Sequence, residues 1–186
     1  MAGRLRITGG KLVRRYFQVP EAADRGLVRP ASDRVREAVF SSLFRLVEDA
    51  TVLDLFAGSG AYGFEAVSRG AKQVTFVEKD PSTARCIGDN IVGLGVQESC
   101  KVVVADALRF VADVTHQRYD LIFADPPYVV QVDPAFWQHV LGILQPVGTV
   151  IYRCAKKQPL ELPAGFEVRR QRAYGGTEVY FLQPST

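Results

Sequence analysis

Apolar runs and helical patterns alternate along most of this 186-residue chain, and this alternation constrains the fold more than any other feature. Five runs are expected to be buried strands: 51–57, 73–78, 101–106, 119–125 and 147–154. Helices are expected after the first four, near 61–69, 81–92, 107–114 and 133–144. Strands that alternate with helices predict an α/β fold, with a parallel sheet and helices on both of its faces.

Both ends of the chain depart from this alternation. Residues 166–174 and 177–183 flank Gly175–Gly176, which predicts an antiparallel hairpin at the C-terminal end of the sheet. Residues 4–20 predict two short strands joined at Gly9–Gly10. After a loop at 20–32, a helix is expected from 33 to about 47. Its apolar face is formed by Val35, Val39, Leu43 and Leu46.

Charge is distributed unevenly along the chain. Residues 1–45 hold ten Lys/Arg against four Asp/Glu, and 146–186 hold six against three, whereas 46–145 hold seven against thirteen. Basic flanks around an acidic middle indicate a surface that meets a polyanion such as a nucleic acid. The alternative is a solvated basic face with no partner. We assign 1–32 to a basic extension that faces the substrate and 33–186 to the main domain.

Composition excludes several classes of protein. No apolar run approaches the roughly 20 residues that span a bilayer, and the first ten residues lack the apolar core of a signal peptide. The three cysteines are widely spaced and form no CxxC pair, so neither a disulfide framework nor a zinc site is indicated. We therefore expect a cytoplasmic protein without a bound metal, and a monomer.

A glycine-rich turn follows the first expected strand of the main domain. Asp54 closes that strand, and Gly58-Ser59-Gly60-Ala61-Tyr62-Gly63 opens the next helix. Glu78 ends the second strand, where a carboxylate can accept both hydroxyls of a ribose. Together these features predict an adenosine-type ligand. The alternative is a turn that needs glycine for packing, with Glu78 solvated.

Acidic residues select among adenosine ligands. Asp54, Glu78, Asp106 and Asp125 all close parallel strands, and the carboxyl ends of such strands meet at the ligand-binding edge of a sheet. An acid immediately before the glycine turn would repel a pyrophosphate. It suits S-adenosylmethionine (SAM), which carries an ammonium and a sulfonium. Asp106 could accept a hydrogen bond from the adenine amino group.

The motif Asp125-Pro126-Pro127-Tyr128 follows the fourth strand. The prolines fix the backbone, so the Asp125 carboxylate and the Pro126 carbonyl can both accept hydrogen bonds from one exocyclic amino group. Tyr128 offers a face on which a flipped base can stack. No cysteine lies in or beside this loop, which disfavours covalent attack on a pyrimidine. The alternative is a structural turn with a core tyrosine.

These segments resemble class I SAM-dependent methyltransferases. Three of them, 52–71, 76–80 and 123–128, are similar to the bacterial family that methylates guanine N2 in small-subunit (16S) ribosomal RNA. Segments 6–15 and 29–44 are similar to that family's N-terminal pattern. They are the specific part of the resemblance, because adenine-N6 DNA enzymes share the DPPY signature. The resemblance covers nearly the whole chain.

The resemblance implies a Rossmann-like, seven-stranded, mostly parallel sheet that ends in a hairpin. It implies SAM as methyl donor and a guanine in 16S rRNA, within the 30S subunit or an assembly intermediate, as target. Gly58 and Gly60 would approach the amino acid end of SAM, Glu78 the ribose and Asp106 the adenine. The segment that includes Arg29, Ser32 and Arg34 would cap the SAM pocket, with the two arginines also assigned to RNA. Arg153 stands where family members often carry an acid, and we expect it to alter RNA affinity but not the chemistry.

The mechanism expected from these motifs is direct displacement of the SAM methyl group by guanine N2, with Asp125 orienting the amine. Binding to RNA phosphates is assigned to the cations of the extension: Arg4, Arg6, Lys11, Arg14 and Arg15. The alternatives are adenine-N6 methylation of nucleic acid and a non-catalytic ribosome-assembly factor that keeps SAM as a structural ligand. An oxidoreductase is disfavoured by Asp54 and by the two prolines.

Overall fold

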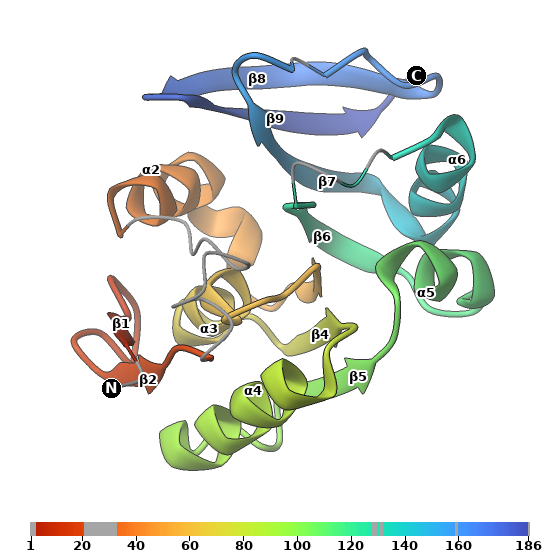
Figure 1. Cartoon of the computed structure of the whole chain (residues 1–186). Helices are drawn as coiled ribbons and strands as arrows, with labels where there is room; N and C mark the ends of the chain where they lie inside the picture. Colours follow the sequence, from red (N-terminus) through yellow and green to blue (C-terminus); the bar gives the residue numbers. More distant parts are fainter. Residues whose placement is uncertain (1–2, 21–32, 128–129, 131, 159, 186) are drawn as a thin grey trace.

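A seven-stranded sheet forms the centre of the molecule in the computed structural model (Figure 1), which describes residues 3–20, 33–127, 130, 132–158 and 160–185. The strand order is β5-β4-β3-β6-β7-β9-β8. The bounds are β3 Thr51–Leu55, β4 Gln73–Glu78, β5 Cys100–Val104, β6 Tyr119–Ala124, β7 Leu144–Ala155, β8 Phe166–Tyr174 and β9 Thr177–Pro184. Strands β3 to β7 pair in parallel, and β9 is antiparallel to both β7 and β8. The predicted sheet with its C-terminal hairpin is confirmed.

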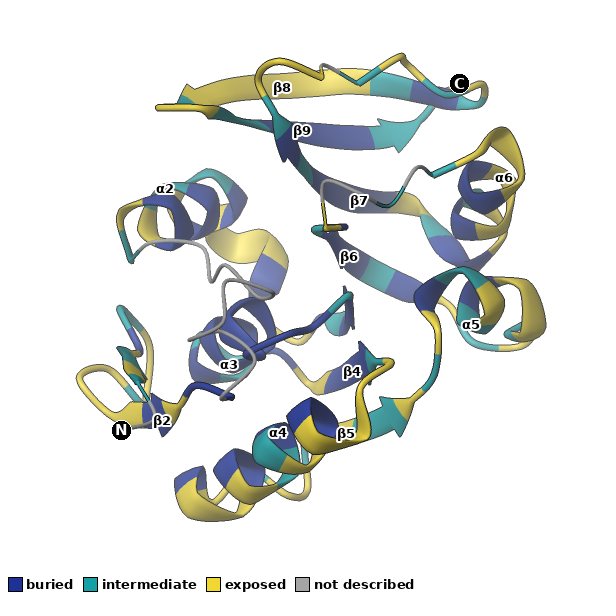
Figure 2. Ribbon diagram, in the orientation of Figure 1, coloured by how far each residue is buried: buried dark blue, intermediate teal, exposed yellow. Residues whose placement is uncertain are grey.

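Helices cover both faces of this sheet, as predicted (Figure 1). They are α2 Asp33–Leu43, the 3-10 helix η1 Phe44–Val47, α3 Ala61–Ser68, α4 Pro81–Leu94, α5 Ala107–Asp113 and α6 Pro134–Ile143. Two clusters of buried apolar side chains result (Figure 2). One joins the sheet to α2, α3 and α4, and we call that side of the sheet the α3 face. The other joins it to α5 and α6, and we call that side the α6 face.

Aspartates and prolines determine where α4 and α6 begin, after the loops at the carboxyl ends of β4 and β6. The Asp80 carboxylate accepts a hydrogen bond from the backbone N–H of Thr83 at 2.7 Å, and Pro81 takes the first helical position of α4. Asp133 and Pro134 begin α6 in the same way. Because each cap satisfies backbone N–H groups that the helix leaves without a partner, these boundaries follow from local sequence.

The N-terminal extension forms a two-stranded antiparallel sheet of β1 (Arg4–Arg6) and β2 (Tyr16–Gln18). The predicted hairpin is confirmed, but Gly9–Gly10 lie within a longer connecting loop instead of forming a tight turn. Gly10 has a φ of 79° and leaves no space for a Cβ beside the Ser68 carbonyl, while the Lys11 N–H donates to that carbonyl at 2.6 Å. The glycines therefore allow close contact with α3.

Further contacts attach this extension to the main domain. The Thr8 N–H donates to the Glu65 carboxylate at 2.7 Å. Ile7 and Phe17 are buried in the α3-face cluster, and the Phe17 ring lies 4.9 Å from that of Phe64. The extension therefore shares a hydrophobic core with the sheet.

The helix expected over 33–47 is in two parts. Val35, Val39 and Leu43 are buried in α2, as predicted. Leu46 was placed on the same apolar face, but it is half-exposed in η1. The prediction assumed a continuous α-helix, whereas the tighter 3-10 turn rotates the last residues away from the core. Among the described residues, none of the helices has both the length and the apolar character needed to span a bilayer.

Candidate active site

Three carboxylates converge where β3, β4 and β6 end. Asp54 pairs in register with Phe76 and with Phe123, whose rings lie in the α3-face cluster. Glu78 and Asp125 each follow one of these phenylalanines by two residues. Because side chains alternate along a strand, all three carboxylates belong to the α3 face at the carboxyl edge. The structure therefore brings together the acids that the sequence placed there.

Asp54 is the most deeply buried of the three acids. Its side chain accepts a hydrogen bond from the Gly63 N–H at 2.9 Å, and the residue is 2% exposed. Desolvation raises the pKa of Asp54 well above its ordinary value, the charges of Asp125 and Glu78 raise it further, and the Gly63 N–H opposes the rise. Because burial and the neighbouring charges disfavour the ionised form of Asp54, a cationic ligand would stabilise that form, and the sulfonium and ammonium of SAM fit this requirement.

The glycine turn is anchored to Glu78. The Gly58 N–H donates to Oε2 of Glu78 at 2.9 Å, and the Asp80 N–H donates to Oε1 at 2.9 Å. Gly58 and Gly60 have φ values of 53° and 74°, which glycine adopts without strain. Phe56 has a φ of 58°, an uncommon conformation for a bulky side chain and one that the sequence did not predict.

Packing also accounts for two of the loop glycines. A Cβ at Gly63 would overlap the Phe76 ring, and one at Gly60 would approach Phe64 and Phe76. Packing therefore requires glycine at these two positions, and this requirement does not exclude a ligand at the same turn. Asp106 caps α5, because its Oδ1 accepts hydrogen bonds from the backbone N–H groups of Leu108 and Arg109. Its role toward adenine stays a prediction.

Asp125 forms an ion pair that the sequence analysis missed. Nε of Arg153 on β7 donates to Oδ1 of Asp125 at 2.7 Å, and the two side chains are only 12% and 17% exposed respectively. Burial raises the pKa of Asp125, while the Arg153 charge and hydrogen bond oppose this rise. Arg153 was expected to affect RNA affinity alone. The structure instead places it against the carboxylate assigned to the chemistry, because β6 and β7 are adjacent and in register.

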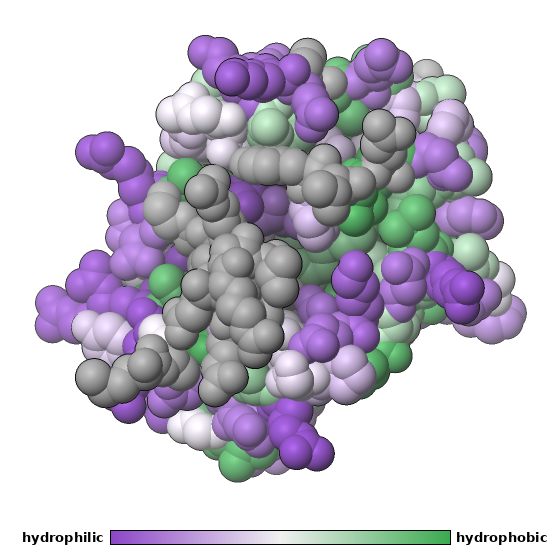
Figure 3. Space-filling model, viewed as in Figure 1, coloured by the Kyte–Doolittle hydropathy of each residue, from purple (hydrophilic) through white to green (hydrophobic). Residues whose placement is uncertain are grey.

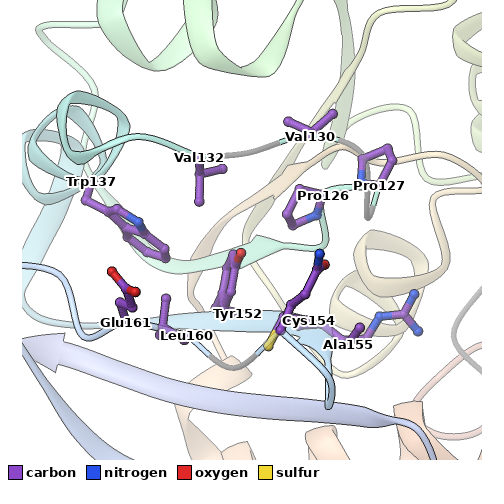
Figure 4. A pocket seen from close by; sticks show the side chains of 12 residues that line it. Pro126, Pro127, Val130, Val132, Trp137, Tyr152, Cys154, Ala155, Leu160 and Glu161 are labelled. Carbon is purple, nitrogen blue, oxygen red and sulfur yellow. The ribbon is translucent and has the colours of Figure 1, made fainter.

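A pocket of about 440 Å³ lies next to Arg153, and its wall includes Trp137, Tyr152 and Cys154 of the α6-face cluster (Figure 4). Pro126, Pro127 and Val132 lie on one side, and Tyr152 and Leu160 on the other (Figure 4). Trp137 closes one end, with its ring 5.0 Å from that of Tyr152. This size suits a nucleoside, and the rings of Trp137 and Tyr152 are flat groups against which a base could pack. No local sequence signal pointed to Trp137 or Tyr152, because they are 15 residues apart and meet only in the fold.

Cys154 lines the same pocket as Pro126, although it comes 28 residues later in the chain. The expectation that no cysteine lies beside the loop holds in sequence but not in three dimensions. The residue is buried, and desolvation together with the negative charge of Glu178 raises the pKa of its thiol. Because the thiolate is the nucleophilic form, this environment disfavours covalent catalysis.

The cations assigned to RNA differ in what they contact. Arg4, Lys11 and Arg14 are exposed on the extension, and Arg34 is exposed on α2. Arg6 lies 3.8 Å from Asp33. Arg15 donates to the carbonyls of Leu94 and Gly93 at 3.1 and 2.9 Å, so its guanidinium caps the C-terminus of α4.

Three predicted site residues, Arg29, Ser32 and Tyr128, lie outside the residues that the structure describes. Within the described part of the chain, no group of three or more His, Cys, Asp or Glu side chains could hold a metal ion.

Comparisons with known proteins point to one family. A family model described as conserved hypothetical protein 95 matches residues 5–183. Ribosomal RNA small subunit methyltransferase D of Haemophilus influenzae is 31% identical over 181 residues, which cover 93% of this chain and 90% of that protein. The Escherichia coli protein of the same name is 37% identical over 127 residues, and the match spans 68% of this chain but only 62% of that relative.

Solved structures agree with these sequence matches. A putative methyltransferase from Escherichia coli has a TM-score of 0.87 at 28% identity, with 99% of both chains covered. A 16S rRNA N2 methyltransferase from T. thermophilus, in complex with AdoMet and guanosine, has a TM-score of 0.73 at 21% identity, over 100% of this chain and 50% of that one, and shows likeness of fold alone. The chain belongs to the family of ribosomal RNA small subunit methyltransferase D, which the family model describes as conserved hypothetical protein 95.

Proposed function

We propose that this chain transfers a methyl group from SAM to the exocyclic N2 of a guanine in 16S rRNA, in the 30S subunit or an assembly intermediate. The observation that carries the proposal is the buried Asp125 carboxylate, which binds Arg153 and directly precedes Pro126 and Pro127 in the wall of a nucleoside-sized pocket. Relatives named small subunit rRNA methyltransferases supply the substrate class. Such a substrate places the activity in the cytoplasm.

The cofactor would lie across the carboxyl ends of β3, β4 and β5. Glu78 keeps acceptor capacity for the ribose hydroxyls beyond its two backbone hydrogen bonds. Gly58 and Gly60 let the backbone approach the amino acid moiety, Asp54 contributes negative charge beneath it, and Asp106 would receive the adenine amino group. When bound, SAM supplies an electrophilic methyl group.

The target base would enter the pocket beside Pro126 and Pro127. An exocyclic amine is a poor nucleophile because its lone pair is delocalised into the ring. Asp125 and the Pro126 carbonyl would accept its two hydrogens and so direct the lone pair toward the methyl group, which is catalysis by orientation. Arg153 occupies Oδ1 of Asp125, so Oδ2 is the atom that we assign to the amine and to the proton released after transfer.

The extension would hold the RNA backbone through its exposed cations Arg4, Lys11 and Arg14, and α2 through Arg34. Contacts with phosphates release counterions, so RNA binding is expected to weaken as salt rises. Arg6 and Arg15 also belong to this assignment, although each makes a protein contact of its own.

Replacement of Asp125 tests this proposal. Asp125→Asn keeps the shape of the side chain but removes the charge, and Asp125→Ala removes the acceptor. Both are expected to bind SAM as the wild-type chain does and to lose transfer of labelled methyl to small-subunit rRNA. Ser82→Ala, on the exposed start of α4, serves as the control. Undiminished transfer by either Asp125 variant would contradict the assignment.

A further inference from the structure

Strand β8 at one edge of the sheet carries a row of arginines that the proposed function does not use. Arg169, Arg170 and Arg172 are all exposed, and they lie far in sequence from the basic extension. Hydrophilic residues gather over the β8–β9 end, at the top of the molecule in Figure 3. The direction in which each arginine points decides whether this row bears on the active site.

A bulge in β8 determines these directions. Val168 pairs with Leu182, but Arg170 pairs with Phe181, so Arg169 is an extra residue opposite the partner strand. Leu182 belongs to the α6-face cluster and Phe181 to the α3-face cluster. Directly paired residues share a face, so the bulge moves the following side chains from the α6 face to the α3 face.

Later pairs in the same hairpin agree. Arg172 pairs with Val179, which is buried in the α3-face cluster, and Tyr174 packs against that cluster. Without the extra residue, Arg170 and Arg172 would follow Val168 onto the α6 face. The bulge therefore places both arginines on the face that carries Asp54, Glu78 and Asp125.

The register also links Arg172 to the catalytic carboxylate. Val179 pairs with Arg172 on one side and with Arg153 on the other, and Arg153 binds Asp125. Neighbouring strands lie about 4.8 Å apart, so the backbone of Arg172 is about 10 Å from that of Arg153. Arg172 thus lies two strands from Arg153, on the α3 face and at the level of Asp125.

Nearby acids are engaged elsewhere. Glu167 lies 3.5 Å from Arg169, and Glu178 accepts a hydrogen bond from the Tyr180 hydroxyl at 2.6 Å on the α6 face. One nitrogen of Arg172 donates to the Gln171 carbonyl at 3.2 Å, which leaves its other donors for a ligand. Arg170 and Arg172 therefore present positive charge on the α3 face.

We propose that Arg170 and Arg172 bind phosphates of the RNA that flanks the target guanine, so that the RNA is held both by the N-terminal extension and by β8. This inference rests on the proposed function, because it takes RNA as the substrate. Exposed charge and a bulge also protect an edge strand from pairing with another chain. Charge on either face of the sheet would protect the edge, whereas phosphate binding requires the charge to be on the face that carries Asp125.

Salt-dependent binding of unmethylated small-subunit rRNA tests the proposal. Each phosphate contact contributes about 0.7 to the slope of log affinity against log salt for a single strand. Arg170→Gln with Arg172→Gln is expected to make this slope shallower by about 1.4, raise KM for RNA and leave SAM affinity unchanged. The matched control is Lys101→Gln with Arg118→Gln, which removes the same charge from the opposite edge strand and from the amino end of β6.

A charge-preserving variant separates position from net charge. Gln171→Arg with Arg172→Gln keeps the composition but moves one arginine to the α6 face, where Gln171 pairs with Tyr180. It is expected to weaken RNA binding as much as Arg172→Gln alone. The proposal would be overturned if the Arg170/Arg172 and Gln171/Arg172 double variants both kept the wild-type salt slope. It would also be overturned if the Lys101/Arg118 control changed the slope as much as the Arg170/Arg172 variant. A wild-type chain that binds RNA but methylates none would instead overturn the proposed function.

Discussion

Replacement of Arg153 by Gln gives a quantitative test of the buried ion pair. The bond to Asp125 is 2.7 Å long, and both side chains are largely withdrawn from water. Removal of one partner from such a pair leaves an uncompensated buried charge, which costs about 3–5 kcal/mol. We therefore expect Arg153→Gln to lower the free energy of unfolding by an amount in this range at neutral pH.

Acidity should reduce this loss. Burial already raises the pKa of Asp125, and loss of Arg153 removes an interaction that opposes the rise. A carboxyl whose pKa is raised in the folded state contributes stability below its unfolded pKa and loses it as pH rises through the folded pKa. The difference in stability between wild type and Arg153→Gln is therefore expected to shrink as pH falls from 7 toward 4.

Denaturant unfolding of four proteins measures the effect: wild type, Arg153→Gln, Asp125→Asn and the double variant. Because the double variant holds no buried charge at this position, it is expected to be more stable than Arg153→Gln alone. A double variant that loses the sum of the two single effects, or a single variant as stable as wild type, would refute the reasoning.

Two further predictions follow. Gly63→Ala is expected to lose about 1–3 kcal/mol of stability, because its Cβ would overlap the Phe76 ring. Gly88→Ala in α4 has open space around it and is expected to gain about 0.5–1 kcal/mol. Equal melting temperatures for the two variants would contradict the packing argument. Affinity for SAM is expected to fall on acidification, and from a higher pH than an ordinary aspartate would give, because the pKa of Asp54 is raised and its protonation removes negative charge. Calorimetric titrations across this range should show the fall in wild type and a flatter profile in Asp54→Asn; the same profile in both would contradict the role of Asp54.

Local sequence was sufficient for the architecture of the sheet. Strands β3 to β6 are apolar runs with an acid at or just beyond the carboxyl end, and residues such as Asp80 with Pro81 begin the helices. These signals act over a few residues, so they survive without knowledge of tertiary contacts. Convergence of Asp54, Glu78 and Asp125 followed from the same reasoning, because parallel strands end at one edge.

Errors arose where distant segments decide a local conformation. The Ser68 carbonyl accepts a hydrogen bond next to Gly10 and so influences the backbone conformation there, and the Leu94 carbonyl at the C-terminus of α4 accepts one from Arg15. Arg153 could not be assigned to Asp125 without the β6–β7 register, since these residues are 28 positions apart. The bulge at Arg169 likewise depends on its partner strand, and the alternation of apolar and polar residues in β8 does not predict it.

The most direct measurement of the central claim is transfer of labelled methyl from SAM to unmethylated 30S subunits, naked small-subunit rRNA and DNA, followed by digestion to nucleosides. The account predicts label in RNA as N2-methylguanosine. Label in DNA, or as N6-methyladenosine, would contradict the substrate while leaving the fold and the cofactor site intact. No label in any substrate, with SAM still bound, would contradict catalysis and favour a ribosome-assembly factor.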